Sequence, residues 1–455
     1  MNNPHVLVIP YPAQGHVRPL LELSQLLVKH GIKITFVNTE FSHQRIMNAF
    51  GSEVSVDASI HFVSLLDGMG VDENKNQIGR SVESICQFMP MKLKQLINEM
   101  NRSNGDEVTC ILTDMFLGWS LEVAAELGIK ATALFPASTL SLASMFAIPM
   151  MIDSGVIDEN GTSLKHEMIQ LSSETPAINP SHFSWVSIEG FTTQKILFNF
   201  FQRNVKAIEK AEWLLSNSTY ELEAKALATM APKVLPIGPL STYEGVGTLV
   251  ANFWPEDSSC LKWLDKQPPH SVVYVAFGSF TILDQTQFRE LALGLQHSNK
   301  PFLWVVRPDI MEAKDEAYPK GFRASVADHG QMVGWAPQRA VLSHPSIACF
   351  LSHCGWNSTL EGVSNGVPFL CWPYFADQFM NESYICEIWK VGLKLERDES
   401  GIIRQEEIKS KMEKLLGDDN LKARAMELKE KIRNSVKEGG CSNKILKSFI
   451  EWVKS

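Results

Sequence analysis

The feature that most constrains the fold is an alternation of short apolar, β-branched runs with longer amphipathic stretches, which occurs twice along the chain. In the first half, strand-like and helix-like stretches alternate at residues 5–9, 19–30, 33–38, 91–100 and 109–113. The pattern restarts with a strand-like run at 271–277, followed by Gly278-Ser279 and a helical pattern at 284–296. Such alternation predicts parallel strands joined by crossover helices. We therefore predict an α/β protein with two Rossmann-like, doubly wound domains.

A change in composition between the two halves indicates a domain boundary. Residues 241–257 contain Ser241, Thr242, Gly245, Gly247 and Thr248, which favour a flexible loop over a packed element. We predict an N-terminal domain over 1–240, a linker over 241–257 and a C-terminal domain over 258–435. The last stretch, 422–454, has helical spacing.

The composition excludes several classes of function. The 455-residue chain is 45% hydrophobic and 20% charged, as expected for an ordinary globular enzyme. Its formal net charge of -9 argues against nucleic acid as a partner, because binding to the phosphate backbone needs clustered Lys and Arg. The uncharged stretch 131–152 is long enough to cross a bilayer, but Pro136 and Pro149 interrupt it. A buried strand at 130–135 followed by a helix explains this stretch better, so we predict no membrane segment.

The cysteines and the N-terminal residues predict a cytoplasmic protein. Eight cysteines are scattered without a CxxC pair, which favours reduced thiols. The apolar run after Pro4 is short and lacks a basic start, so we expect no secretion. His344, His353 and Cys354 do not have the spacing of zinc ligands, so no metal is expected. Nothing in the sequence requires more than a monomer.

Residues 335–378 carry the strongest functional signal. The segment reads WAPQRAVLSHPSIACFLSHCGWNSTLEGVSNGVPFLCWPYFADQ. An indole at Trp335 can stack on a flat base, and Gln338 can hydrogen-bond to the edge of that base. The strand-like run 347–352 leads through His353 and Gly355 into a predicted helix at 359–365. Free backbone N–H groups at such a helix start can bind a diphosphate without a metal.

The remaining polar residues of this segment complete a nucleotide-sugar site. Glu361 lies one helical turn beyond Asn357, where its carboxylate can accept hydrogen bonds from a ribose diol. Asp377 and Gln378 follow the turn at Trp372-Pro373, which could direct both side chains to the hydroxyls of a hexose. Base, diphosphate, ribose and sugar thus each have a candidate partner.

Position by position, this segment resembles the signature of the plant secondary-product UDP-glycosyltransferases, and the resemblance extends along nearly all of the chain. It implies the glycosyltransferase B (GT-B) fold, with two domains facing each other across a cleft and a C-terminal helix, 436–455, packing back on the N-terminal domain. The residues that match the family's UDP-sugar contacts are Trp335, Gln338, His353, Asn357, Ser358, Glu361, Asp377 and Gln378. In the family, a final Gln usually accompanies glucose, and Trp356 has the form found in glucosyl enzymes. UDP-glucose is therefore the implied donor.

A general base is expected in the first domain, because ligands of such sheets bind beyond the carboxyl ends of the strands. His16 follows the first strand, and a neutral imidazole can accept the proton of an alcohol or a phenol. Asp114, at the end of the strand 109–113, is the candidate that orients it, as the acid does in hydrolase triads. The family assigns the same two roles to the matching positions. Attack from the face opposite UDP would invert the anomeric centre and give a β-glucoside.

The leaving diphosphate needs charge stabilisation, which the helix start near Asn357 and Ser358, together with His353 and the Gly278-Ser279 turn, would supply. No metal or other cofactor is required in this scheme. Many relatives place a hydroxyl residue soon after the strand that ends at Phe135, where it touches the sugar. Ser138 or Thr139 could fill that place here, and neither is assigned.

The acceptor is expected to be a small, largely apolar molecule with a hydroxyl or carboxyl group, such as a phenolic, a flavonoid, a terpenoid or a hormone. Five aromatic residues are candidates either for the acceptor pocket or for ordinary core packing: Phe183, Trp185, Phe198, Phe200 and Phe201.

Other interpretations of the same residues stay open. His16 alone could be a hydrogen-bonded loop histidine, Asp114 a helix N-cap, and Ser358 with Glu361 a capping box. Gly15 does not belong to a GxGxxG fingerprint, so a dinucleotide dehydrogenase is poorly supported. The same fold with UDP-galactose or UDP-xylose as donor is one alternative function. A nucleotide-sugar binding protein without turnover is another.

Overall fold

The computed structural model describes residues 4–50, 60–70, 73–74, 77–102, 107–173, 175–186, 189–229, 234–247, 252–310 and 318–455. The chain forms two compact units. The first comprises Met1–Phe253, Phe375–Met380 and Ile432–Ser455, and the second comprises Trp254–Tyr374 and Asn381–Lys431. Residues 248–251 of the predicted linker, with Thr248, lie outside the described residues.

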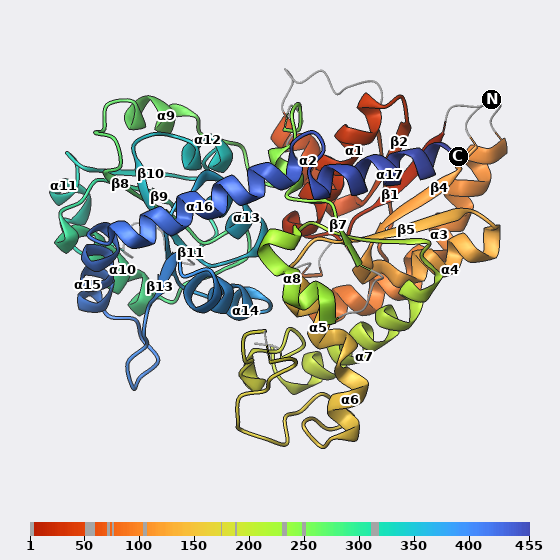
Figure 1. Cartoon of the computed structure of the whole chain (residues 1–455), viewed down its shortest axis with the longest axis horizontal. Coiled ribbons are helices and arrows are strands. Elements are labelled where there is room, and N and C mark those ends of the chain that lie inside the picture. The colour runs from red at the N-terminus through yellow and green to blue at the C-terminus, as the bar shows by residue number, and fades with distance from the viewer. Residues whose placement is uncertain are drawn as a thin grey trace. The chain divides into compact units, whose positions relative to one another are not determined.

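The first unit is built on a parallel sheet with the strand order β3-β2-β1-β4-β5-β6-β7 (Figure 1). Its strands are β1 (His5–Ile9), β2 (Lys33–Thr39), β3 (Ile60–Leu65), β4 (Cys110–Asp114), β5 (Lys130–Phe135), β6 (Trp213–Ser216) and β7 (Val234–Pro236). The helices between them are α1 (Gln14–Lys29), α2 (Glu40–Phe50), α3 (Ile78–Arg102), α4 (Gly118–Leu127), α5 (Thr139–Phe146), α6 (Ile148–Asp153), α7 (Phe191–Ala207) and α8 (Tyr220–Thr229). The strands β1, β2, β4 and β5 are buried along almost their whole length, because helices cover a parallel sheet on both faces.

The second unit repeats this plan with the strand order β10-β9-β8-β11-β12-β13, again with parallel pairing. Its strands are β8 (Val272–Ala276), β9 (Phe302–Val305), β10 (Gly330–Val333), β11 (Ile347–Ser352), β12 (Phe369–Cys371) and β13 (Gly392–Lys394). Its helices are α9 (Ser259–Leu264), α10 (Gln285–Ser298), α11 (Phe322–Ser325), α12 (Gln338–Leu342), α13 (Trp356–Asn365) and α15 (Gln405–Leu416). The residues of α14 (Gln378–Ser383) and of α16 (Asp419–Val436) are divided between the two units. Two Rossmann-like sheets were predicted from the sequence, and the structure contains both.

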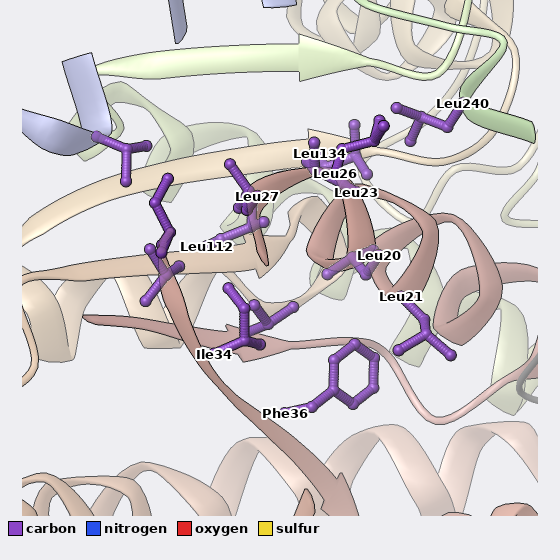
Figure 2. Close-up of a cluster of buried hydrophobic side chains, with 14 of the residues drawn as sticks. Leu20, Leu21, Leu23, Leu26, Leu27, Ile34, Phe36, Leu112, Leu134 and Leu240 are labelled. Atoms are coloured by element: carbon purple, nitrogen blue, oxygen red, sulfur yellow. The ribbon is translucent and has the colours of Figure 1, made fainter. Parts of the chain in front are cut away.

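The core of the first unit joins residues far apart in the sequence. Figure 2 shows leucines of α1, such as Leu20 and Leu27, packed with Ile34 and Phe36 of β2 and with Leu112 of β4. The last helix, α17 (Cys441–Lys454), contributes Leu446, Phe449, Ile450 and Val453 to the same cluster. Figure 1 shows α17, at the blue end of the chain, beside the red N-terminal elements.

Each sheet has one place where the strand order reverses. In the first unit, β1 lies between β2 and β4, so the chain moves outward in one direction through β3 and then restarts on the other side of β1. In the second unit, the same reversal occurs between β8 and β11. Open α/β sheets bind their ligands beyond the carboxyl ends of the strands at these reversal points. The topology therefore directs attention to the segments that follow β1, β4, β8 and β11.

Several helices begin earlier than the sequence predicted. The helix α1 starts at Gln14 rather than near residue 19, and Pro19 lies inside it. The helix α3 extends well beyond the predicted 91–100 and contains Pro90. The stretch 131–152 forms β5, α5 and part of α6, as a buried strand followed by helix. Among the described residues, no helix combines the length and the apolar character needed to span a membrane.

Candidate active site

His16 and Asp114 meet at the reversal point of the first sheet. The strands β1 and β4 pair in parallel, and His16 lies in the first turn of α1, which follows β1. The Nδ1 atom of His16 is 2.7 Å from Oδ2 of Asp114. Asp114 is fully buried, whereas 18% of the His16 side chain is exposed. A buried carboxylate at this distance fixes the orientation of the imidazole and leaves Nε2 as the ring nitrogen available to a ligand.

The second oxygen of Asp114 has a structural role. Oδ1 accepts a hydrogen bond of 2.9 Å from the backbone N–H of Phe116 and so caps the short 3₁₀ helix Met115–Leu117. The carboxylate therefore acts as an N-cap and as the partner of His16 at the same time. Because both oxygens are engaged, the carboxylate has little freedom to rotate.

Aromatic rings surround the imidazole. The rings of Tyr11 and Phe116 each lie 5.1 Å from the His16 ring, measured between centroids. Phe200 and Phe201 pack against Phe116 at 6.1 and 5.2 Å. Burial, with a smaller contribution from the charge of Asp114, raises the pKa of the Tyr11 hydroxyl, which stays protonated. The face beside His16 is thus largely apolar and aromatic.

The five aromatic candidates for the acceptor pocket fall into two groups. Phe183 and Trp185 stack at 4.5 Å, and Trp185 packs edge-on against Phe198 at 5.4 Å. These three side chains are at most 1% exposed, so they are core residues of the first unit. Phe200 and Phe201 instead belong to the aromatic group that contacts the ring next to His16.

Ser138 and Thr139 are both engaged within the protein. Ser138 caps α5 by accepting a hydrogen bond from the backbone N–H of Ser141, and Thr139 donates to Glu223 through its backbone N–H and its hydroxyl. Glu223 also accepts from Ser218 and from the N–H of Leu140. Burial raises the pKa of Glu223, and these donors oppose the shift. This carboxylate ties α8 to the start of α5.

In the second unit, Gln338 links three residues. Its amide nitrogen donates to Oγ of Ser358 at 2.9 Å and to Oε2 of Glu361 at 2.7 Å, and its oxygen accepts from the Tyr274 hydroxyl at 3.1 Å. The structure therefore brings together Gln338, Ser358 and Glu361, which the sequence assigned to one nucleotide site. It also adds Tyr274, from β8, which sequence reasoning missed because that residue reads as an ordinary aromatic strand position.

The helix α13, which carries Ser358 and Glu361, begins three residues earlier than predicted. Its N-cap is Gly355, which makes no side-chain capping bond, and the N–H of Thr359 donates to the Gly355 carbonyl. Ser358 therefore lies in the first turn instead of at the cap. The capping-box interpretation of Ser358 and Glu361 is wrong, because both side chains bind Gln338.

His353 lies between two glycines at the reversal point of the second sheet. A Cβ atom added at Gly278 or at Gly355 would come within 2.5 Å of its Nε2 atom, so glycine at both places makes room for the ring. Gly278 also has a φ of +67°, which disfavours other residues. Burial, followed by the nearby charge of Arg307, lowers the pKa of His353 to about 4, although an interaction with the Ala276 backbone opposes this. The imidazole is neutral at pH 7.

The other predicted donor residues have varied surroundings. Trp335 and Asn357 are half-buried, as is Ser279. Trp356 is 4% exposed and its ring lies 6.3 Å from that of Trp389, so its side chain serves packing.

Asp377 and Gln378 belong to the segment Phe375–Met380, which groups with the first unit. Asp377 is half-buried. Gln378 is buried, and its side-chain oxygen accepts a hydrogen bond of 3.2 Å from the N–H of Phe375. Within the described parts of the chain, no group of three or more His, Cys, Asp or Glu side chains could hold a metal ion.

Two features indicate the class of protein: the pair of Rossmann-like sheets, and the site residues described above. These site residues are His16 with Asp114 in the first unit, and Gln338 with Ser358 and Glu361 in the second. The family model described as "UDP-glucoronosyl and UDP-glucosyl transferase" matches residues 5–434. The chain belongs to this family: it is a plant-type UDP-glycosyltransferase with the GT-B fold.

Individual relatives agree with this assignment. UDP-glycosyltransferase 83A1 of Arabidopsis thaliana is 44% identical over 465 residues, covering 100% of this chain and 98% of its own length. The structure of Phytolacca americana UGT2, complexed with UDP-2fluoro-glucose and pterostilbene, has a TM-score of 0.82 at 27% identity, covering 99% of each chain. A UDP-glucosyltransferase from Polygonum tinctorium capable of glucosylating indoxyl has a TM-score of 0.82 at 29% identity, covering 100% of this chain and 99% of its own.

Proposed function

We propose that this UDP-glycosyltransferase is an inverting glucosyltransferase that transfers glucose from UDP-glucose to a small, largely apolar acceptor bearing a hydroxyl or carboxyl group. The observation that carries the proposal is the bond between the partly exposed His16 and the buried Asp114 at the reversal point of the first sheet. A protein that only binds nucleotide sugars has no need of a base held in this way.

The proposed reaction moves one proton and one sugar. Nε2 of His16 accepts the proton of the acceptor hydroxyl, and the acceptor oxygen forms a bond to the anomeric carbon of glucose. The bond between that carbon and the diphosphate oxygen breaks, and UDP leaves with the electron pair. Asp114 stabilises the imidazolium that forms without taking up its proton. Attack on the face opposite UDP converts an α-linked donor into a β-linked product.

For the donor, we propose that uracil and ribose bind at Trp335, Gln338 and Glu361. The hydrogen bonds among Gln338, Ser358 and Glu361 support this, because they bring together polar side chains that can form hydrogen bonds to a ligand in place of their present bonds. The diphosphate is proposed to bind at the half-buried Ser279 and Asn357, with the neutral His353 beside them. Trp356 would contribute its backbone at the start of α13.

Asp377 and Gln378 are proposed to bind the glucose hydroxyls. The preference for glucose rests on the presence of Gln378 at the end of the signature segment. UDP-galactose and UDP-xylose are the alternatives that donor competition would test.

For the acceptor, the aromatic rings beside His16 support an apolar molecule with a flat or compact body. Pterostilbene, present in the complex of Phytolacca americana UGT2, and indoxyl, which the Polygonum tinctorium enzyme can glucosylate, are of this kind. We further propose that the reaction needs no metal or other cofactor and that the enzyme acts as a monomer in the cytoplasm. All eight cysteines are free thiols, which suits a reducing compartment.

The first experiment incubates the purified protein with UDP-glucose and a mixed panel of phenols, flavonoids, terpenoids and carboxylic acids, and follows hexosyl mass gain by mass spectrometry. His16→Ala is compared with His30→Ala, which changes an exposed histidine at the other end of the same helix. Products that persist in His30→Ala and disappear in His16→Ala support the proposal. Binding of UDP-glucose by the wild type with no product from any acceptor would favour the non-catalytic alternative.

A further inference from the structure

Arg307 is a buried cation that the signature segment does not include. It follows β9, and its side chain is 1% exposed. Nε donates to Oδ1 of Asp309 at 2.8 Å, and Nη2 donates to the carbonyl of Thr281 at 2.9 Å. Nη1 donates to the carbonyl of Gly278. A single guanidinium thus binds two carbonyls of the loop that leads from β8 to α10.

These two bonds fix the direction of the loop backbone. In a trans peptide unit, the carbonyl and the following N–H point in opposite directions. Since the Gly278 carbonyl points at Arg307, the N–H of Ser279 points away from it. The planar fork of arginine suits two acceptors three residues apart, whereas a lysine ammonium has no such fixed geometry.

The positive charge of Arg307 is poorly compensated inside the protein. Its one carboxylate partner among the described residues, Asp309, is 45% exposed, so water screens much of the negative charge. The guanidinium itself is out of solvent and close enough to His353 to oppose protonation of that ring. A buried positive charge beside the β8 end would attract an anionic ligand there.

We propose that Arg307 is a positioning residue for the diphosphate of the donor: it holds the Gly278–Thr281 turn so that the Ser279 N–H faces the diphosphate, and it supplies positive charge from behind that turn. This inference rests on the proposed function, because it takes UDP to bind at the ends of β8 and β11. An alternative is that Arg307 only stabilises the fold. The two roles differ in one respect, namely whether the effect depends on the phosphates of the ligand.

The test measures the affinities of UDP and uridine by isothermal titration calorimetry for the wild type, Arg307→Lys and Arg307→Met. Arg424→Met is the matched control, because Arg424 lies in the second unit and also donates to a main-chain carbonyl, that of Lys390. We expect Arg307→Met to weaken UDP binding by at least about tenfold while uridine binding changes by less than about twofold. Arg307→Lys should fall between this variant and the wild type. Arg424→Met should leave the UDP-to-uridine affinity ratio unchanged.

Two results would overturn the inference: a parallel loss of UDP and uridine affinity, which indicates a purely structural role, or an unchanged UDP affinity. If Arg307→Met does not fold, the test relies on Arg307→Lys. A UDP-to-uridine affinity ratio equal to that of the wild type in Arg307→Lys would contradict positioning by the guanidinium fork. A wild type that binds neither UDP nor uridine would instead refute the proposed function. The two failures are therefore distinguishable.

Discussion

Asp114→Asn tests the proposed base most directly, because it changes one charge and almost no volume. In the transition state, the imidazolium of His16 and the carboxylate of Asp114 form an ion pair. Charges roughly 4 Å apart interact by about 4 kcal/mol at an effective dielectric constant of about 20. Since each 1.4 kcal/mol or so corresponds to a factor of ten in rate, losing this attraction should lower kcat by about a thousandfold.

The hydrogen bonds of Asp114 add a second effect in the same direction. The N–H of Phe116 requires an acceptor at the position of Oδ1, so an asparagine would place its amide oxygen there. Its NH₂ group would then face Nδ1 of His16, which lies 2.7 Å from the other oxygen in the wild type. A donor at that place makes Nδ1 an acceptor and leaves the proton on Nε2. The base nitrogen would be blocked.

The assay is steady-state UDP release with saturating UDP-glucose and the best hydroxyl acceptor of the panel, supported by UDP titration and a thermal melt. Asp418→Asn is the matched control, because Asp418 accepts the N–H of Leu421 at 2.9 Å near the start of α16 without contacting a histidine. We expect kcat to fall in Asp114→Asn alone, with unchanged UDP affinity. A folded Asp114→Asn enzyme that keeps more than about a tenth of the wild-type kcat would refute the orienting role.

Three further predictions concern Gly355, Glu223 and His353. Gly355→Ala should weaken UDP binding by about tenfold or more, because the added Cβ clashes with His353. Gly334→Ala is the control and should bind UDP normally, because no atom lies within 4 Å of its added Cβ. Equal UDP titration curves for the two variants would contradict this packing argument. Glu223→Gln should lower the free energy of unfolding by about 1–3 kcal/mol, because an amide cannot accept hydrogen bonds from all four donors. The melting temperature of this variant should drop by roughly 2–10 °C. The control Glu221→Gln, which changes an exposed glutamate, should melt like the wild type. The pKa of His353 is lowered from 6.5 to about 4 in the folded protein. Between pH 6.5 and pH 4, this histidine is therefore protonated in the unfolded chain but neutral in the folded chain. The contribution of His353 to stability is therefore complete above about pH 6.5 and falls towards pH 4, with a loss of about 2 kcal/mol at pH 5. Denaturant unfolding at pH 7 and pH 5 should show a larger loss of stability in the wild type than in His353→Gln.

The strands that were placed from the sequence agree with the structure to within a residue or two, whereas the starts of α1, α3 and α13 were placed too late. The runs 5–9, 130–135 and 347–352 coincide with β1, β5 and β11, because strands buried on both faces are mostly apolar. The helices α1 and α13 have Ala13 and Gly355 as their N-caps, and neither residue supplies a side-chain capping bond. Pro19 and Ser358 offered stronger local signals for a helix start, and both lie inside the helix.

Three site residues were predictable because they are polar and lie at or soon after the end of a strand. His353 directly follows β11, Asp114 is the last residue of β4, and His16 lies in the first turn of the helix that follows β1. Arg307 also follows a strand, but an arginine there reads as an exposed charge, and its burial depends on how the loop after β8 folds over it. Tyr274 could not be assigned because its partner, Gln338, lies 64 residues away in the sequence.

The two units carry different groups of residues at the same topological position. Beyond β1 and β4, the space is occupied by a titratable pair, with a buried carboxylate holding an imidazole among aromatic rings. Beyond β8 and β11, the conspicuous features are glycines that make room for a neutral ring and a helix start without a side-chain cap. The first arrangement includes a group that can change charge, whereas the second has a helix start whose N-cap, Gly355, makes no side-chain capping bond. In the function we propose, proton abstraction and diphosphate stabilisation are separate tasks, and a repeated sheet supplies two equivalent positions in which the residues for each can differ.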